Sequence, residues 1–244
     1  MPRSPRVEVA GGIYHVTVRG NRRQLIFRDD RDRESLLCRL DEVAVEHAWT
    51  WLSYCLMPNH WHLVVEIAEK TLADGMQRLA GEHAQRFNRR HEVDGHLFQG
   101  RYWAKMVRSD TQFAQLLRYV ALNPVAAGLC ADPSEWRWSS HRATLNGWPA
   151  ATRARKRVEE LLEVWSGDAG DRYARLFDPS GSLALSYGMD SPWEHRPPLA
   201  ELLASGSLDE GMRLARDHGY RLAEIAKAVG LHESTVSRRA RRAS

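Results

Sequence analysis

The sequence predicts an α+β fold: a ferredoxin-like split-βαβ antiparallel sheet with one added helix, followed by a small helical C-terminal module. Two observations carry this prediction. The first half of the chain alternates between the two-residue period of strands and the 3.6-residue period of helices, in the order β-α-β-β-α-β-α. The end of the chain regains helical periodicity after a stretch rich in Gly, Asp, Ser and Pro.

Four segments have the alternation of strands. Residues 13–20 (IYHVTVRG) are β-branched at alternate positions. Residues 49–57 and 60–67 flank the turn dipeptide Pro58–Asn59, so we expect them to pair as an antiparallel hairpin. The fourth strand is expected at 102–109, after a loop that glycines punctuate.

Helices are expected between these strands and after the last one. The pair Asp29–Asp30 can cap an apolar stripe that continues to about His47, and residues 71–90 carry a second apolar face. Ser109–Asp110 opens a third helix through Leu122. We expect Asn123–Pro124 to end it, because a proline disfavours the helical conformation of the residue before it.

Composition limits the class of protein. Of the 244 residues, 43% are hydrophobic and 27% are charged, as in ordinary globular proteins. The first residues lack the apolar core of a signal peptide, and no apolar run approaches the roughly 18 residues that cross a bilayer. We therefore expect a cytoplasmic protein with no membrane partner. Cys38, Cys55 and Cys130 lack CxxC spacing, which argues against a disulfide framework or a cysteine zinc site.

Positive charge gathers at the two ends of the chain. Residues 211–244 hold eight Lys or Arg against three Asp or Glu, a surplus of five, so the other 210 residues sum to −1 of the net +4. Basic ends suggest a polyanionic partner such as nucleic acid. We predict a catalytic domain at 1–148, a linker with an irregular or helical extension at 149–207, and a DNA-binding tail at 208–244.

The tail resembles a helix-turn-helix. One helix is expected at 222–228, a turn at Gly230, and a basic second helix from about Glu233. Recognition helices of this kind place polar residues on base edges and basic residues on phosphates. The expected DNA contacts in the tail are Arg238, Arg239, Arg241 and Arg242.

His60 and His62 are the first candidate site residues. They lie two apart on a predicted strand, so both imidazoles project from one face and can converge on one metal ion. Tyr119 and Asn123 lie four residues apart on one helical face, where a phenol and an amide oxygen can point to the same centre. A lone His-x-His or a lone tyrosine is more often structural, but their combination favours a site.

Several ordered motifs together closely resemble the single-tyrosine HUH transposases, most nearly the REP-associated tyrosine transposases. These motifs are MPNHWHLVVEI, LLRYVALNPVAAGL and WRWSSHRA. The segments GGIYHVTVRGNRR and LFQGRYWAKMV resemble the same family, so the resemblance spans roughly residues 5–147. It implies a metal-dependent endonuclease and strand transferase that acts on single-stranded, hairpin-bearing DNA through a covalent 5′-phosphotyrosine.

The resemblance also implies roles for individual residues. His60 and His62 would form the metal-binding His-hydrophobic-His pair, Tyr119 would be the nucleophile, and Asn123 would be the third metal ligand. Trp61 takes the middle position, where smaller aliphatic residues are more usual, and should point to the opposite side of the strand. The family further implies a homodimer.

The cofactor is expected to be Mg²⁺ or Mn²⁺. Imidazole pairs suit zinc or manganese, whereas phosphate chemistry and an amide oxygen favour magnesium or manganese. The sequence has no GxxxxGK[ST] phosphate loop, so no nucleotide cofactor is expected. Basic residues near the first and fourth strands are candidate phosphate contacts: Arg19, Arg22, Arg23, Arg101, Lys105 and Arg108.

Two other functions stay open at this stage. In a zinc hydrolase, His60 and His62 would bind the metal while Tyr119 would be only structural. In a DNA-binding regulator that derives from a transposase, the chemistry would be lost. The full set of His, His, Tyr and Asn argues against the second alternative, and a covalent protein–DNA adduct would exclude the first.

Overall fold

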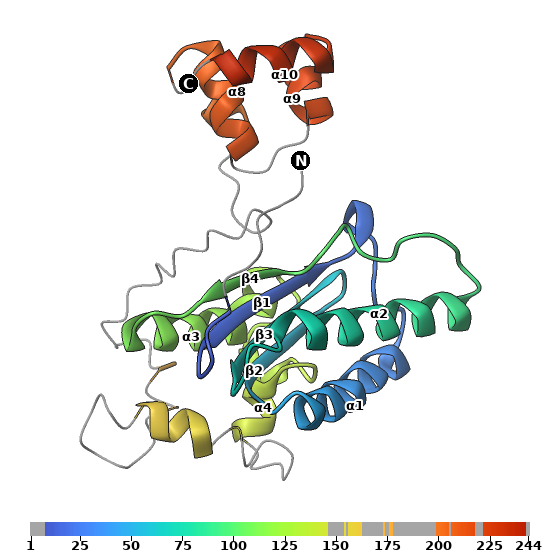
Figure 1. Cartoon of the computed structure of the whole chain (residues 1–244), viewed down its shortest axis with the longest axis vertical. Coiled ribbons are helices and arrows are strands. Elements are labelled where there is room, and N and C mark those ends of the chain that lie inside the picture. Colours follow the sequence, from blue (N-terminus) through green and yellow to red (C-terminus); the bar gives the residue numbers. More distant parts are fainter. Residues whose placement is uncertain are drawn as a thin grey trace. The chain divides into compact units, whose positions relative to one another are not determined.

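The computed structural model describes residues 8–145, 154, 156–162, 173, 176–177, 199–204, 206–217 and 222–242. The chain forms two compact units, Met1–Tyr187 and Gly188–Ser244 (Figure 1). No helix among the described residues is long and apolar enough to cross a membrane.

The first unit contains the predicted sheet and its helices. Four antiparallel strands lie in the order β2-β3-β1-β4, which confirms the ferredoxin-like α+β fold. The elements of this unit are β1 (Ile13–Arg19), η1 (Asn21–Arg23), α1 (Asp30–Glu46), β2 (Trp49–Met57), β3 (His60–Ile67), α2 (Leu72–His91), β4 (Trp103–Met106), α3 (Asp110–Ala126), η2 (Pro133–Glu135) and α4 (Ser140–Leu145).

The predicted hairpin is confirmed, whereas the fourth strand is shorter than predicted. β2 and β3 pair antiparallel across Pro58–Asn59. β4 covers only four of the eight residues from 102 to 109. The chain leaves the sheet early because it prepares the next helix: Ser109 accepts a hydrogen bond from the Gln112 N–H, and the Gln112 side chain accepts one from the Arg108 N–H.

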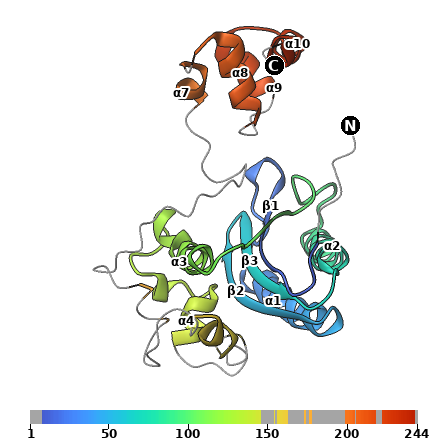
Figure 2. The ribbon, with the colours of Figure 1, turned by 60° about the vertical axis from the view of Figure 1, so that its left-hand side comes forward.

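Helices cover both faces of the sheet (Figure 2). α1 and α2 pack on one face, here called the α1/α2 face, and α3 packs on the other, here called the α3 face. Because side chains alternate along a strand, β3 sends Trp61, Leu63 and Val65 into the apolar core under α1 and α2. The residues between them, His62 and Val64, are also buried, and they belong to the α3 face.

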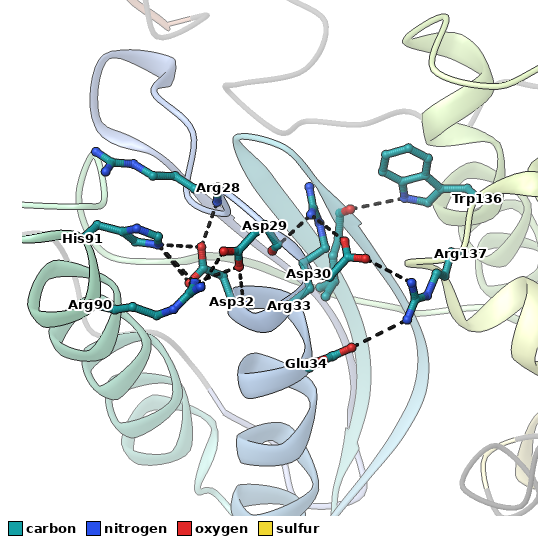
Figure 3. A network of polar contacts seen from close by, with 11 residues as sticks. Arg28, Asp29, Asp30, Asp32, Arg33, Glu34, Arg90, His91, Trp136 and Arg137 are labelled. Carbon is teal, nitrogen blue, oxygen red and sulfur yellow. Dashed lines mark hydrogen bonds and ion pairs between the residues drawn. The ribbon is translucent and has the colours of Figure 1, made fainter.

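A polar network fixes the start of α1 against the end of α2 (Figure 3). Arg90 donates to both Asp29 and Asp32, and His91 Nε2 lies 2.8 Å from Asp32 Oδ2. The hydrogen bonds from Arg90 lower the pKa of Asp29 to about 2. Burial by itself raises the pKa of Asp32, but hydrogen bonds from the Arg28 N–H, His91 and Arg90 outweigh it and hold that pKa below its ordinary value.

The predicted end of the third helix is wrong. α3 continues through Asn123 and Pro124 to Ala126, with the proline buried inside the helix. It ends instead at Gly128, which has a φ of 68°. The Gly128 N–H donates to the Val125 carbonyl and the Leu129 N–H to the Pro124 carbonyl, a Schellman ending. Asn123 therefore lies within the helix, one turn after Tyr119.

The segment after η2 covers the outer edge of β2. The Leu56 N–H donates to the Trp138 carbonyl, the Tyr54 N–H donates to Ser140 Oγ, and Trp136 Nε1 donates to the Leu56 carbonyl. These bonds use main-chain groups of β2 that a further strand would otherwise need.

The first compact unit extends beyond the predicted boundary at residue 148. Arg157, in the helical segment 156–162, forms two hydrogen bonds to the Glu66 carboxylate, at 2.8 and 2.7 Å. The Tyr173 hydroxyl lies 2.9 Å from His141 Nδ1, and Arg118 donates to the Leu176 carbonyl. Most of the linker expected at 149–207 lies outside the described residues.

The second unit is helical. The helices predicted at 222–228 and from Glu233 are present as α9 (Leu222–Val229) and α10 (Glu233–Arg242), with Gly230 at a φ of 67° between them. Two further helices, α7 (Leu199–Ala204) and α8 (Leu208–Asp217), complete the unit. Its core is formed by Leu202, Met212, Ala215, Ile225, Ala226, Val236 and Ala240. Because Leu202 belongs to this core, the unit begins before the predicted Leu208.

Candidate active site

The α3 face of the sheet carries both candidate histidines. In the register between β1 and β3, Thr17 lies opposite His62 and Arg19 lies opposite His60. The two histidine rings are 5.0 Å apart between centroids and nearly perpendicular. Trp61, between them in sequence, is 1% exposed and contacts Phe27 on the other face. The strand thus separates the histidines from the apolar core, as predicted.

Tyr119 lies edge-on beside His62. Its ring centroid is 5.5 Å from that of His62, with the ring planes at 87°. α3 places it there because its apolar residues Phe113, Leu116, Leu117 and Val120 are buried, while Tyr119 itself is half-buried. Asn123 is half-buried as well and follows one turn later on the same helical face. The structure therefore brings Tyr119 and His62 together, and it places Asn123 next along the helix.

Neighbouring residues bind one nitrogen of each histidine. His60 Nδ1 lies 2.7 Å from the Asn59 side-chain oxygen, which can only accept, so Nδ1 carries the proton. His62 Nδ1 lies 2.9 Å from His15 Nε2. Metal-bound histidines usually donate the N–H of their second ring nitrogen to such a partner. The donor set therefore fits a metal ion bound through the Nε2 atoms of His60 and His62.

A third protein ligand would have to come from outside the His, Cys, Asp and Glu side chains that usually bind metal ions. Among the residues that the structure describes, no group of three or more His, Cys, Asp or Glu is arranged to hold a metal ion. An amide oxygen satisfies the same requirement for a hard divalent cation. Asn123 offers such an oxygen one turn after Tyr119, on the same face of α3.

Sequence reasoning missed His15. It is fully buried on β1, and its ring contacts those of His62 and Tyr119. A signal was present: in a strand, residues 15, 17 and 19 share one face, and here they are His, Thr and Arg between the apolar Tyr14, Val16 and Val18. The alternation predicts the strand, but it does not show that its polar side faces the same site as the His-x-His pair.

The basic residues predicted near the first and fourth strands divide into two groups. Arg19 and Lys105 lie on the α3 face, because Arg19 pairs with His60 and Lys105 with His15 in the sheet register. Both are half-buried. The others are exposed outside the strands: Arg22, Arg23, Arg101 and Arg108. The sheet register thus places only the first group on the face of the histidines.

Asn59 links the arginine turn to His60. Arg22 and Arg23 both adopt left-handed conformations, with φ of 51° and 62°. The Asn59 side-chain amide donates to the Arg23 carbonyl, and the Asn59 carbonyl accepts from the Gly20 N–H. One residue therefore braces the strained turn through its backbone and amide group while its side-chain oxygen accepts from His60.

The tail arginines do not share one environment. Arg239 is half-buried and forms an ion pair of 2.6 Å with Asp209 of α8, so it joins α10 to its own unit. Arg238 is exposed, as is Ser234 one turn earlier. Arg241 and Arg242 belong to the last turn of α10, and their side chains lie outside the described residues.

Comparison with known proteins shows which family this region resembles. Residues 8–123, which include both histidines, Tyr119 and Asn123, match the family described as "Transposase IS200 like". The chain is 25% identical over 151 residues to a Haemophilus influenzae protein that carries the name REP-associated tyrosine transposase, a match over 54% of this chain and 81% of that protein. The resemblance to the REP-associated tyrosine transposases is thereby confirmed.

One solved structure shares the fold of this chain. A REP-associated tyrosine transposase bound to a REP hairpin superimposes with a TM-score of 0.52 and 18% sequence identity. The match covers 70% of this chain and 94% of that one. At this identity it supports the shared fold.

Proposed function

We propose that this protein cleaves and rejoins single-stranded DNA that carries a hairpin, through a covalent 5′-phosphotyrosine at Tyr119. The observation that carries the proposal is the position of the Tyr119 ring, edge-on to His62 at 5.5 Å. In a zinc hydrolase with a merely structural tyrosine, nothing would require a half-buried phenol beside a metal-binding histidine. The hairpin is proposed because a structural relative was solved bound to one.

The chemistry is a transfer of one phosphodiester bond. The Tyr119 oxygen attacks phosphorus as the bond from phosphorus to the 3′ oxygen breaks. The phenol loses its proton and the departing 3′ oxygen gains one, so no proton is consumed overall. The bond energy is kept in the phosphotyrosine, and a 3′-hydroxyl can reverse the step and rejoin the strand. Neither ATP nor another energy source is needed.

His60, His62 and Asn123 would hold Mg²⁺ or Mn²⁺. Such an ion would neutralise charge on the non-bridging phosphate oxygens. Arg19 and Lys105, on the same face of the sheet, would contact the DNA phosphates near the cleaved bond. The more exposed basic residues would follow the strand further away: Arg22, Arg23, Arg101 and Arg108.

The test is adduct formation. The full chain is incubated with a single-stranded hairpin oligonucleotide and Mn²⁺ or Mg²⁺, and the products are separated on a denaturing gel. We expect a protein–DNA adduct that is absent when EDTA is added. Cleavage without any adduct would support the hydrolase instead, and hairpin binding without cleavage would support a regulator.

We propose that α10 of the second unit contacts duplex DNA. Its exposed face carries Ser234 and Arg238, while Val236 and Ala240 are buried in the unit. On duplex DNA, Arg238→Ala should flatten the plot of log affinity against log salt by about 0.9. Lys227→Ala, which removes an exposed cation from α9, should leave the slope unchanged. An unchanged slope in Arg238→Ala would contradict this role.

We also propose that the protein acts as a homodimer, as the family resemblance implies. The outer edge of β2 is covered by residues 136–140, so a partner would use another surface. Light scattering at micromolar concentration is expected to give the dimer mass. A monomer that still cleaves hairpin DNA would contradict this proposal.

A further inference from the structure

His15 lies between the two parts of the proposed site. Its ring is nearly coplanar with that of His62 and meets it edge to edge, with centroids 5.2 Å apart and planes at 20°. The same ring meets Tyr119 edge-on at 6.0 Å and Trp103 edge-on at 5.3 Å. A fully buried histidine thus contacts both a proposed metal ligand and the proposed nucleophile.

The hydrogen bond between the two histidines has a direction once His62 binds a metal. His15 Nε2 and His62 Nδ1 are 2.9 Å apart, so one nitrogen carries the proton and the other accepts it. A ligand nitrogen must offer a lone pair. For His62 to bind through Nε2, its proton must be on Nδ1, and His15 Nε2 must accept it. His15 then carries its own proton on Nδ1.

Thr17 is the second polar group at this bond. Its hydroxyl lies 3.4 Å from both His15 Nε2 and His62 Nδ1, which is long for a hydrogen bond. The nearer acceptor for the His62 proton is therefore His15. His60 has its own acceptor in Asn59 on the other side of the site. His60 and His62 are thus held by different residues: Asn59, on the turn between β2 and β3, and His15, buried in the sheet.

We propose that His15 is a positioning residue that fixes the proton of His62 on Nδ1 and so presents Nε2 for metal binding. This inference rests on the proposed function, because it assigns a role to a further residue of the same site. The hydrogen bond also restricts the orientation of the His62 ring beside Tyr119. Partners of this kind typically contribute about 10- to 100-fold to metal affinity.

Manganese binding tests this role directly. Free Mn²⁺ is followed by electron paramagnetic resonance in titrations of the full chain, with His60→Ala as the control for the site. His15→Phe keeps an aromatic ring but removes the acceptor, and we expect about 10- to 100-fold weaker binding. His15→Gln can place an amide oxygen near the position of Nε2, and it should restore most of the affinity.

The outcomes separate this inference from the proposed function. Equal affinity in the parent and in His15→Phe, with binding that His60→Ala abolishes, would overturn the role of His15 alone. Binding that His60→Ala leaves unchanged would overturn the metal site and this inference with it.

A second measurement needs no variant at His15. Long-range proton–nitrogen correlation spectra of the metal-free parent report which His62 nitrogen carries the proton, with His62→Gln used to assign the signal. We expect the proton on Nδ1. A His62 ring protonated mainly on Nε2 would overturn the proposal even where His15→Phe fails to fold.

Discussion

The two faces of the sheet differ in the kind of side chain that they bury. On the α1/α2 face, the same strands present apolar residues such as Val16, Trp61 and Leu63, all nearly inaccessible to solvent. On the α3 face they present His15, Thr17 and His62, which are equally buried but polar. Burial on the first face removes apolar area from water, which stabilises the fold. Burial on the second face holds polar rings in fixed positions.

Two tyrosines illustrate the difference. Tyr102 precedes β4 and packs in the apolar core of the α1/α2 face, with 8% of its surface exposed. Tyr119 is half-buried beside His62 on the α3 face. The side of the sheet, and not the residue type, therefore favours Tyr119 over Tyr102 as the proposed nucleophile.

The largest expected effect is on chemistry at the α3 face. His60→Ala and His62→Ala should each abolish metal-dependent cleavage of hairpin DNA, because each removes an imidazole ligand. EDTA should do the same to the parent. Asn123→Ala should reduce cleavage less, since water can replace a neutral oxygen ligand. Cleavage assays on labelled oligonucleotides give the rates, and undiminished cleavage in EDTA would remove the metal from the mechanism.

The matched change on the other face is Trp61→Ala. Trp61 is adjacent to His62 in sequence but is packed against Phe27, His83 and Phe98. Its removal should lower the free energy of unfolding by about 3–5 kcal/mol, as for other buried tryptophans. Urea unfolding measures the loss. Folded Trp61→Ala protein should still form the DNA adduct, whereas a stable variant without adduct would show that the faces are not independent.

A smaller effect is expected in the polar network that joins α1 to α2. Asp32→Ala removes the acceptor for Arg90, His91 and the Arg28 N–H, and should destabilise the fold by about 2 kcal/mol. Arg137→Ala, which loses exposed pairs with Asp30 and Glu34 and a cation–π contact with Trp138, is the control and should cost at most about 1 kcal/mol.

This network also sets an acid dependence. The pKa values of Asp29 and Asp32 are lower in the folded protein than their ordinary value of 3.8. Their contribution to stability is therefore present above about pH 4 and is lost as the pH falls through the folded values, which for Asp29 means towards about pH 2. Urea unfolding between pH 5 and pH 2, over roughly this window, should show a weaker dependence in Asp32→Ala. An unchanged dependence would assign the acid sensitivity elsewhere.

The smallest effect is expected from the ion pair within the second unit. Arg239→Ala removes the 2.6 Å pair with Asp209, in which both side chains are about one third exposed. Such pairs contribute about 0–1 kcal/mol. Thermal unfolding of the full chain should show a small shift, and Asp209→Ala should match it. A large effect of Arg239→Ala that Asp209→Ala does not share would indicate a function beyond the pair.

Much of the fold could be predicted from local sequence rules. Alternation gave the first three strands, and the turn Pro58–Asn59 gave the hairpin. The rule that a proline ends a helix failed at Pro124, because buried packing and the Gly128 ending keep the helix intact. The length of β4 was overestimated because the backbone N–H of Arg108 already binds the first turn of α3 and so leaves the sheet. Tertiary packing therefore contributed to the first error, whereas local capping decided the second.

The site was predicted in part. Residues close in sequence, such as His60 with His62 and Tyr119 with Asn123, reveal their shared faces through period alone. His15 could not be joined to them in that way, because 47 residues separate it from His62 and only the order of the strands brings the two together. The pairing of Arg239 with Asp209 depends likewise on helix packing.

The most direct test of the account is the identity of the DNA-linked residue. After incubation with a hairpin oligonucleotide and Mn²⁺, the adduct is digested and the modified peptide is identified by mass spectrometry. The account predicts a nucleotide phosphate on Tyr119. Tyr119→Phe should bind the hairpin without forming an adduct, while Tyr102→Phe should form it as the parent does. An adduct that persists in Tyr119→Phe, or one mapped to Tyr102, would contradict the assignment of chemistry to the α3 face.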